Sequence, residues 1–173
     1  MRVIHIVGYS NVGKTRLIEA LCARLSGGVM VLKFSHHLGS DRPGSDTSRF
    51  AARQADTLLL QPDQMTWRGS VPLAIDWARM AHYYGWMIWE GGKYLPTPKI
   101  VLDSQAILDQ VSNVRLVIGP NRTQTPGLDY YGAELPLGID VSQDIAAYIL
   151  NHQQLLSFCW KDPSALDFFQ KSS

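Results

Sequence analysis

The residues with the clearest chemical meaning lie near the N-terminus, where residues 8–15 read GYSNVGKT. This segment is a complete match to the G-x-x-x-x-G-K-S/T pattern of a phosphate-binding loop. Its glycines let the backbone curl so that successive N–H groups point at phosphate oxygens, and a following helix adds the positive end of its dipole. We expect Lys14 to reach the β- and γ-phosphates, and the Thr15 hydroxyl to bind a magnesium ion held between them. The predicted nucleotide contacts from this segment are Gly8, Asn11, Val12, Gly13, Lys14, Thr15 and Arg16.

A second polar segment follows the next apolar run, where residues 33–47 read KFSHHLGSDRPGSDT. A segment of this length without regular structure is more often functional than not. His36 and His37 are candidates for binding phosphate, stabilising developing charge or ligating a metal; the alternative is a solvated pair on the loop. Asp41 or Asp46 is a candidate magnesium ligand, and Asp46 is equally suited to cap the short helix predicted after it.

A third candidate is Glu90, which ends the apolar run 86–89 and is followed by Gly91 and Gly92. Phosphate-loop NTPases place at this position, usually as aspartate, the acid that holds magnesium through water or orients the attacking water. The two glycines permit close approach of the backbone to a γ-phosphate, which adds Gly91 to the nucleotide contacts. The predicted catalytic residues are therefore Lys14 and Glu90. The predicted metal ligands are Thr15, Glu90 and Asp46.

The elements that must position these residues follow from the periodicity of the chain. Apolar runs without alternation, typical of strands buried on both faces, lie at Val3–Val7, Val29–Leu32, Thr57–Leu60, Trp86–Trp89, Ile100–Leu102 and Val114–Ile118. Helical patterns lie at Lys14–Leu25, Asp46–Ala55, Pro72–Tyr84, Ser104–Gln110, Ser142–Phe158 and Ser164–Gln170, with Ser142 as a candidate N-cap. Together they predict an α/β fold of the P-loop NTPase type, with a mostly parallel sheet flanked by helices on both faces. No repeat or low-complexity linker divides the chain, so we expect residues 1–173 to form a single nucleotide-binding domain.

Composition excludes several other classes. The chain has 46% hydrophobic and 18% charged residues, which is ordinary for a folded domain. A formal charge of +1 without any lysine- or arginine-rich block argues against nucleic-acid binding. Cys22 and Cys159 show no metal-site spacing and indicate a reducing compartment. No apolar run approaches about 20 residues and the N-terminus begins in a predicted strand, so we expect no membrane span, no signal peptide and a cytoplasmic protein.

Several of these segments together resemble the molybdopterin-guanine dinucleotide biosynthesis protein B family, which are GTP-binding accessory proteins of molybdenum cofactor maturation. The resemblance is carried by the phosphate loop, by Lys33 with His36 and His37, by DRPGSDT at 41–47 and by IWEGGK at 88–93. The chain departs from the family pattern at Phe34, Ser45 and Gly92, and Gln54-Ala55 stands where the family has an alanine-glycine pair. The guanine-reading N-K-x-D motif is not evident, so a guanine preference is implied by the resemblance alone.

The resemblance implies a GTP- and magnesium-binding homodimer that assists formation of molybdopterin guanine dinucleotide and hydrolyses GTP weakly. Its implied partners are molybdopterin or a separate cofactor transferase protein. Slow hydrolysis agrees with the residues, because no clear arginine finger or water-orienting glutamine is present; Arg42, Arg49 or Arg53 are the candidates for added charge. Two alternatives stay open. One is a small-molecule or nucleotide kinase, and the other is an adapter that binds a nucleotide without hydrolysing it.

Overall fold

The structure is a computed structural model that describes residues 1–35, 49–50, 52–53, 55–62, 64–69, 83–102, 107–120 and 128–159. The helix predicted at 164–170 lies outside these residues, as do most of the helix predicted at 72–84 and half of the helix predicted at 46–55. The described part of the helix predicted at 104–110 is a 3-10 turn, η1 (Leu108–Gln110).

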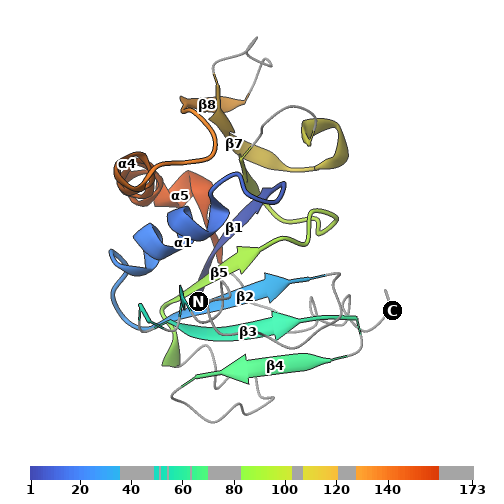
Figure 1. Cartoon of the computed structure of the whole chain (residues 1–173), viewed down its shortest axis with the longest axis vertical. Helices are drawn as coiled ribbons and strands as arrows, with labels where there is room; N and C mark the ends of the chain where they lie inside the picture. Colours follow the sequence, from blue (N-terminus) through green and yellow to red (C-terminus); the bar gives the residue numbers. More distant parts are fainter. Residues whose placement is uncertain are drawn as a thin grey trace.

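The described strands form one nine-stranded, mostly parallel sheet with β1 near its centre (Figure 1). Along the sheet the order is β4-β3-β2-β5-β1-β6-β7-β8, and β9 pairs with the beginning of β1. Only β4 and β9 run antiparallel to their partners among the described strands. The strands are β1 (Arg2–Gly8), β2 (Val29–Phe34), β3 (Asp56–Leu60), β4 (Met65–Arg68), β5 (Trp86–Glu90), β6 (Lys99–Leu102), β7 (Val114–Gly119), β8 (Asp129–Gly132) and β9 (Phe158–Cys159). The predicted α/β class and mostly parallel sheet are confirmed.

The strands that the sequence did not predict are β4, β8 and β9. Their sequences, MTWR, DYYG and FC, carry no continuous apolar run. The first two lie at the ends of the sheet order, where one side of a strand has no described neighbour. Such edge strands form because a neighbouring strand offers its hydrogen bonds, so their own residues carry only a weak strand signal.

The described helices are α1 (Lys14–Cys22), α4 (Ile139–Asn151) and α5 (Gln153–Leu156). The Ser142 N-cap prediction is wrong, because α4 begins three residues earlier, with Gly138 as its N-cap. Ser142 is instead buried inside the first turn, where its hydroxyl donates to the Gly138 carbonyl at 2.6 Å. A serine within a helix satisfies its hydroxyl on the preceding turn in this way. None of the described helices is both long enough and apolar enough to cross a membrane.

The sheet is covered on both faces. Helices α1 and α4 pack on one face, where Leu17, Ile18 and Leu21 are fully buried against the central strands. Burial of each such side chain stabilises the fold by about 1.5–3 kcal/mol. The opposite face holds a second apolar cluster around Trp89, and the η1 turn packs beside it over β1 and β6. This packing holds the beginning of α1 at the carboxyl end of β1, next to the ends of β5 and β2 (Figure 1).

Candidate nucleotide-binding site

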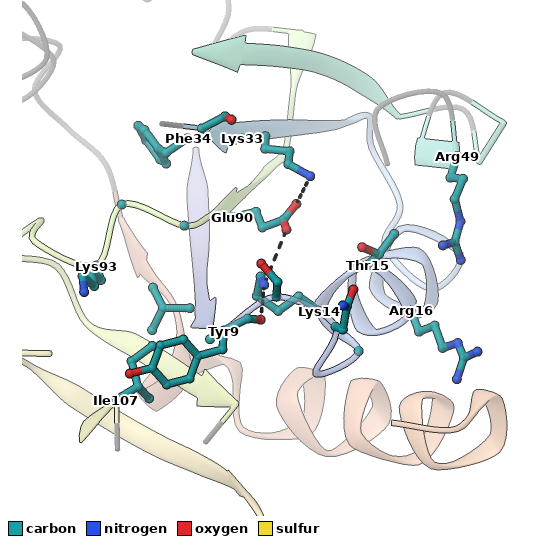
Figure 2. Close-up of a pocket in the computed structure, with 18 residues that line it drawn as sticks. Tyr9, Lys14, Thr15, Arg16, Lys33, Phe34, Arg49, Glu90, Lys93 and Ile107 are labelled. Carbon is teal, nitrogen blue, oxygen red and sulfur yellow. Dashed lines mark hydrogen bonds and ion pairs between the residues drawn. The ribbon is translucent and has the colours of Figure 1, made fainter. Parts of the chain in front are cut away.

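A cavity of about 620 Å³ opens where β1, β5 and β2 end (Figure 2). Its described walls come from the loop before α1, the end of β2 and the turn after β5. The lining residues are Val7, Gly8, Tyr9, Ser10, Asn11, Gly13, Lys14, Thr15, Arg16, Lys33, Phe34, Ser35, Arg49, Glu90, Gly91, Gly92, Lys93 and Ile107. Basic side chains outnumber the single acidic one, Glu90, in this lining. Such a lining favours a ligand with several negative charges.

The phosphate loop is shaped by close backbone contacts. Gly8 has no space for a side chain, because a Cβ there would lie 2.8 Å from the Leu102 carbonyl oxygen. Gly13 is the N-cap of α1 with φ of 99°, and a Cβ on it would lie 2.7 Å from the Leu137 nitrogen. The Leu137 N–H donates to the Val12 carbonyl at 3.2 Å. The segment before α4 is therefore packed directly on the loop, a contact that the motif does not reveal.

Substituting Gly13 with alanine is expected to destabilise the protein and to remove phosphate binding. The left-handed backbone alone costs a non-glycine residue about 1–2 kcal/mol. Gly27→Ala is a matched control, because Gly27 has φ of 87° and a Cβ added to it would meet nothing within 4 Å. Urea unfolding and phosphate titration of both variants separate the cost of the left-handed backbone, which both share, from the steric clash with Leu137, which only the Gly13 variant has. Equal losses of stability in the two variants would contradict the contact with Leu137.

Lys14 reaches back across its own loop. Its Nζ donates to the Tyr9 carbonyl at 2.7 Å and lies 4.0 Å from Oε1 of Glu90. The side chain is 13% exposed, so its ammonium group is partly accessible from the cavity. A phosphate that enters the loop can replace the Tyr9 carbonyl as the acceptor, because an anionic oxygen is a stronger partner than a neutral carbonyl.

Glu90 is nearly buried and lies between two lysines. The Lys33 Nζ approaches Oε2 of Glu90 to 3.5 Å, while Lys14 approaches the other oxygen. Lys33 and Glu90 are paired in register on the neighbouring parallel strands β2 and β5, so their side chains project on the same face. Lys33 was not among the predicted site residues. Its position at the end of an apolar strand was the one indication that Lys33 could belong to the site. The strand register that places it beside Glu90 cannot be predicted from the local sequence.

The chemistry of the donor set in the cavity fits a magnesium ion. Thr15 and Glu90 both line the cavity, and magnesium is usually held by few protein oxygens together with phosphates and water. The other predicted ligand, Asp46, lies outside the described residues, as do His36 and His37. Within the described ranges no group of three or more histidine, cysteine, aspartate and glutamate side chains gathers at one place.

Gly91 lies in the cavity wall with a specific backbone role. Its φ is 85°, and a Cβ there would lie 2.8 Å from the Phe34 carbonyl oxygen at the end of β2. Its N–H donates to the Ile6 carbonyl at 3.1 Å, and its carbonyl lies 2.6 Å from Nε2 of His5. The glycine thus allows β2 and β5 to approach closely, and β1 holds its amide and carbonyl.

His5 is a fully buried histidine behind the Glu90 turn, and sequence reasoning did not single it out. Its Nε2 contacts the Gly91 carbonyl and its Nδ1 lies 2.6 Å from the Thr97 hydroxyl. Because a carbonyl only accepts, Nε2 carries the proton and Nδ1 accepts from Thr97. Burial lowers the pKa of His5 to about 4; the Gly91 hydrogen bond opposes this shift, and the nearby Lys99 charge adds to it.

The lowered pKa of His5 predicts a loss of stability in acid. Between pH 6.5 and 4 the unfolded chain binds a proton on this residue that the folded protein does not bind, so stability falls as the pH falls through this range. The full shift corresponds to about 3 kcal/mol. Urea unfolding at pH 7 and pH 4 is expected to show a smaller acid loss in His5→Gln than in the wild type. His152→Gln, which changes an exposed histidine, is expected to keep the wild-type loss.

The candidate arginines are placed unequally. Arg49 lines the cavity, but its guanidinium makes a two-pronged contact with Glu19 on α1, at 2.8 and 2.9 Å. Arg16 lines the cavity too and donates to the Leu137 carbonyl at 2.7 Å. Arg53 is not among the described lining residues, and Arg42 lies outside the described part of the chain.

Comparisons with known proteins find related sequences. The family described as "Molybdopterin guanine dinucleotide synthesis protein B" (MobB) matches residues 3–117, a span that includes the phosphate loop and Glu90. A Bacillus subtilis (strain 168) relative, "Probable molybdopterin-guanine dinucleotide biosynthesis adapter protein", is 29% identical over 160 residues, which cover 80% of this chain and 89% of the relative.

Solved structures are similar in fold. The crystal structure of Bacillus subtilis MobB aligns with a TM-score of 0.52 at 20% identity, covering 90% of this chain and 98% of that one. A MobB homologue from Bacillus stearothermophilus aligns with a TM-score of 0.50 at 21% identity, covering 88% and 97%. At these identities the likeness supports a shared fold.

Proposed function

Since this chain belongs to the molybdopterin guanine dinucleotide synthesis protein B family, we propose that it is a GTP- and magnesium-binding adapter of molybdenum cofactor biosynthesis. Its role is to assist formation of molybdopterin guanine dinucleotide. The observation that carries the proposal is the cavity in which Lys14, Thr15 and Glu90 meet at the carboxyl edge of the sheet. Family membership supports the assignment to this pathway, and the residues of the cavity support a ligand with several phosphates.

The described residues divide the work of binding. The loop amides and the beginning of α1 surround the phosphates, and Lys14 turns from the Tyr9 carbonyl to the phosphate oxygens. Thr15 offers its hydroxyl to magnesium, and Glu90 holds a water of the ion or the attacking water. Magnesium, when bound, neutralises charge that develops on the phosphate oxygens.

We propose that hydrolysis at this site is slow. Arg49, the cavity residue that is a candidate for added positive charge, is bound to Glu19. Arg16 is bound to the Leu137 carbonyl. No glutamine lines the described part of the cavity. Such groups contribute about 10³- to 10⁵-fold to the rate where they are present.

The proposed partners are GTP, molybdopterin or a cofactor transferase protein, and a second copy of the chain. The family supports these partners. Large apolar side chains stand exposed on the described surface, including Tyr83, Tyr94 and Ile139, and they offer contact area to a protein partner. Light scattering of the purified protein at several concentrations tests the homodimer.

Calorimetric titration with non-hydrolysable GTP, GDP and ATP analogues, with and without magnesium, tests the nucleotide assignment. We expect magnesium-dependent binding of guanine nucleotides and no binding of the ATP analogue. Equal or preferential ATP binding would contradict the assignment and favour a kinase, which transfer of the γ-phosphate to an added acceptor would reveal. Phosphate release from GTP that is lost in Lys14→Met separates slow hydrolysis from binding without turnover.

A further inference from the structure

We propose that Lys33 is a second phosphate-contacting cation that lets this site distinguish a triphosphate from a diphosphate, an inference that rests on the proposed function of the same cavity. Its Nζ lies 3.5 Å from Oε2 of Glu90. Figure 2 shows Lys33 and Lys14 reaching Glu90 from opposite sides, each pointing into the cavity. The carboxylate is therefore balanced by one lysine from the phosphate loop and by one from a neighbouring strand.

The two lysines lie in different secondary structure elements. Lys14 is the first residue of α1, directly after the phosphate loop, whereas Lys33 lies in β2, which is hydrogen-bonded to β5 on one side and β3 on the other. The residues before Lys33 in this strand are buried. The backbone of such a strand holds the base of the Lys33 side chain in place when a ligand enters. The Lys33 side chain is nevertheless 20% exposed and forms part of the cavity lining.

In the proposed complex, ligand binding changes the positive charge close to the Glu90 carboxylate. When Lys14 turns to the phosphates, the buried carboxylate loses one of the cations that now face it. A buried carboxylate with less compensating charge is costly, so a cation that stays in place is required. Lys33 supplies that charge from the strand. Its ammonium group has three donors, and so it can face Glu90 and a phosphate oxygen together.

The position of Lys33 in the cavity determines which phosphate it can contact, and we expect this to be the terminal one. In phosphate-loop sites the strand-end acid lies near the terminal phosphate, while the other phosphates lie over the loop and the helix N-terminus. Lys33 is next to that acid, and Figure 2 shows it on the opposite side of the Glu90 carboxylate from Lys14. A diphosphate seated in the loop ends before it reaches Lys33. The contact is therefore made by a triphosphate alone.

Calorimetry in magnesium buffer with inorganic tripolyphosphate, pyrophosphate, a non-hydrolysable GTP analogue and GDP tests this proposal. Lys33→Met is expected to weaken binding of the triphosphate ligands about 10- to 100-fold, the range for loss of a charged hydrogen bond. Binding of the diphosphate ligands is expected to weaken by a clearly smaller factor, because they lose only the charge that balances Glu90 and not a phosphate contact. Lys93→Met removes the same charge from the cavity wall away from Glu90, and it is expected to weaken both classes alike.

Lys33→Arg keeps the positive charge and is expected to restore most of the discrimination. Equal weakening of both ligand classes by Lys33→Met, or no weakening, would overturn the proposal. If thermal unfolding shows that the methionine variant does not fold, Lys33→Gln supplies the same comparison with a neutral donor facing Glu90. Binding of tripolyphosphate without any binding of guanine nucleotides would overturn the GTP assignment and leave the Lys33 test intact. Wild-type protein that binds none of the four ligands would overturn both.

Discussion

Replacing Lys14 with methionine is expected to weaken GTP binding by about 100-fold or more. Each charge-assisted hydrogen bond contributes about 1.5–3 kcal/mol, and the ammonium group of this lysine contacts more than one phosphate oxygen in the proposed complex. The fold is expected to survive. The Lys14 side chain is partly exposed. When it is removed, the Tyr9 carbonyl can be solvated from the cavity, and Glu90 still faces Lys33.

Calorimetry with a GTP analogue, together with thermal unfolding of the free protein, measures the effect of Lys14→Met. Lys14→Arg is a charge-conserving control. The longer planar guanidinium does not replace a compact ammonium group in a tight loop, so this variant is also expected to bind poorly. An affinity within about 3-fold of the wild type in Lys14→Met would contradict the placement of phosphates in this loop.

Replacing Glu90 with glutamine is expected to slow magnesium-dependent GTP hydrolysis by about 10²- to 10³-fold without weakening GTP binding. The amide has nearly the same shape but cannot accept a proton or hold a water of the metal as a carboxylate does. Removal of the negative charge leaves Lys14 and Lys33 facing each other across the cavity. Additional positive charge favours a bound polyphosphate, so affinity is expected to stay the same or increase.

Single-turnover phosphate release and calorimetry on the same preparation separate the two effects of Glu90→Gln. Glu90→Asp keeps the charge on a side chain one methylene shorter, and we expect it to retain more activity than the glutamine variant. Unchanged hydrolysis in Glu90→Gln would remove Glu90 from the catalytic site. A parallel loss of binding and hydrolysis would instead indicate that the carboxylate mainly supports the shape of the cavity.

The phosphate loop, the central strands and the family were accessible from the sequence because their signals are local. Eight consecutive residues specify the loop, and a strand buried on both faces reads as an apolar run wherever it lies in the sheet. Glu90 was accessible for the same reason, since it directly follows such a run. The edge strands β4 and β8 were missed because their short sequences carry no continuous apolar run and they form by pairing with β3 and β7.

The sequence by itself therefore determined the chemistry available to this protein: a loop for phosphate, a lysine and a threonine at its end, and a carboxylate after a buried strand. The tertiary structure alone decided which other groups share that site. The β2–β5 register brings Lys33 to Glu90, the segment before α4 places Leu137 against Gly13, and β1 places a buried His5 behind Gly91. These pairings join residues far apart in the chain. They follow from strand register and side-chain packing, which depend on the whole fold and not on any short run of residues.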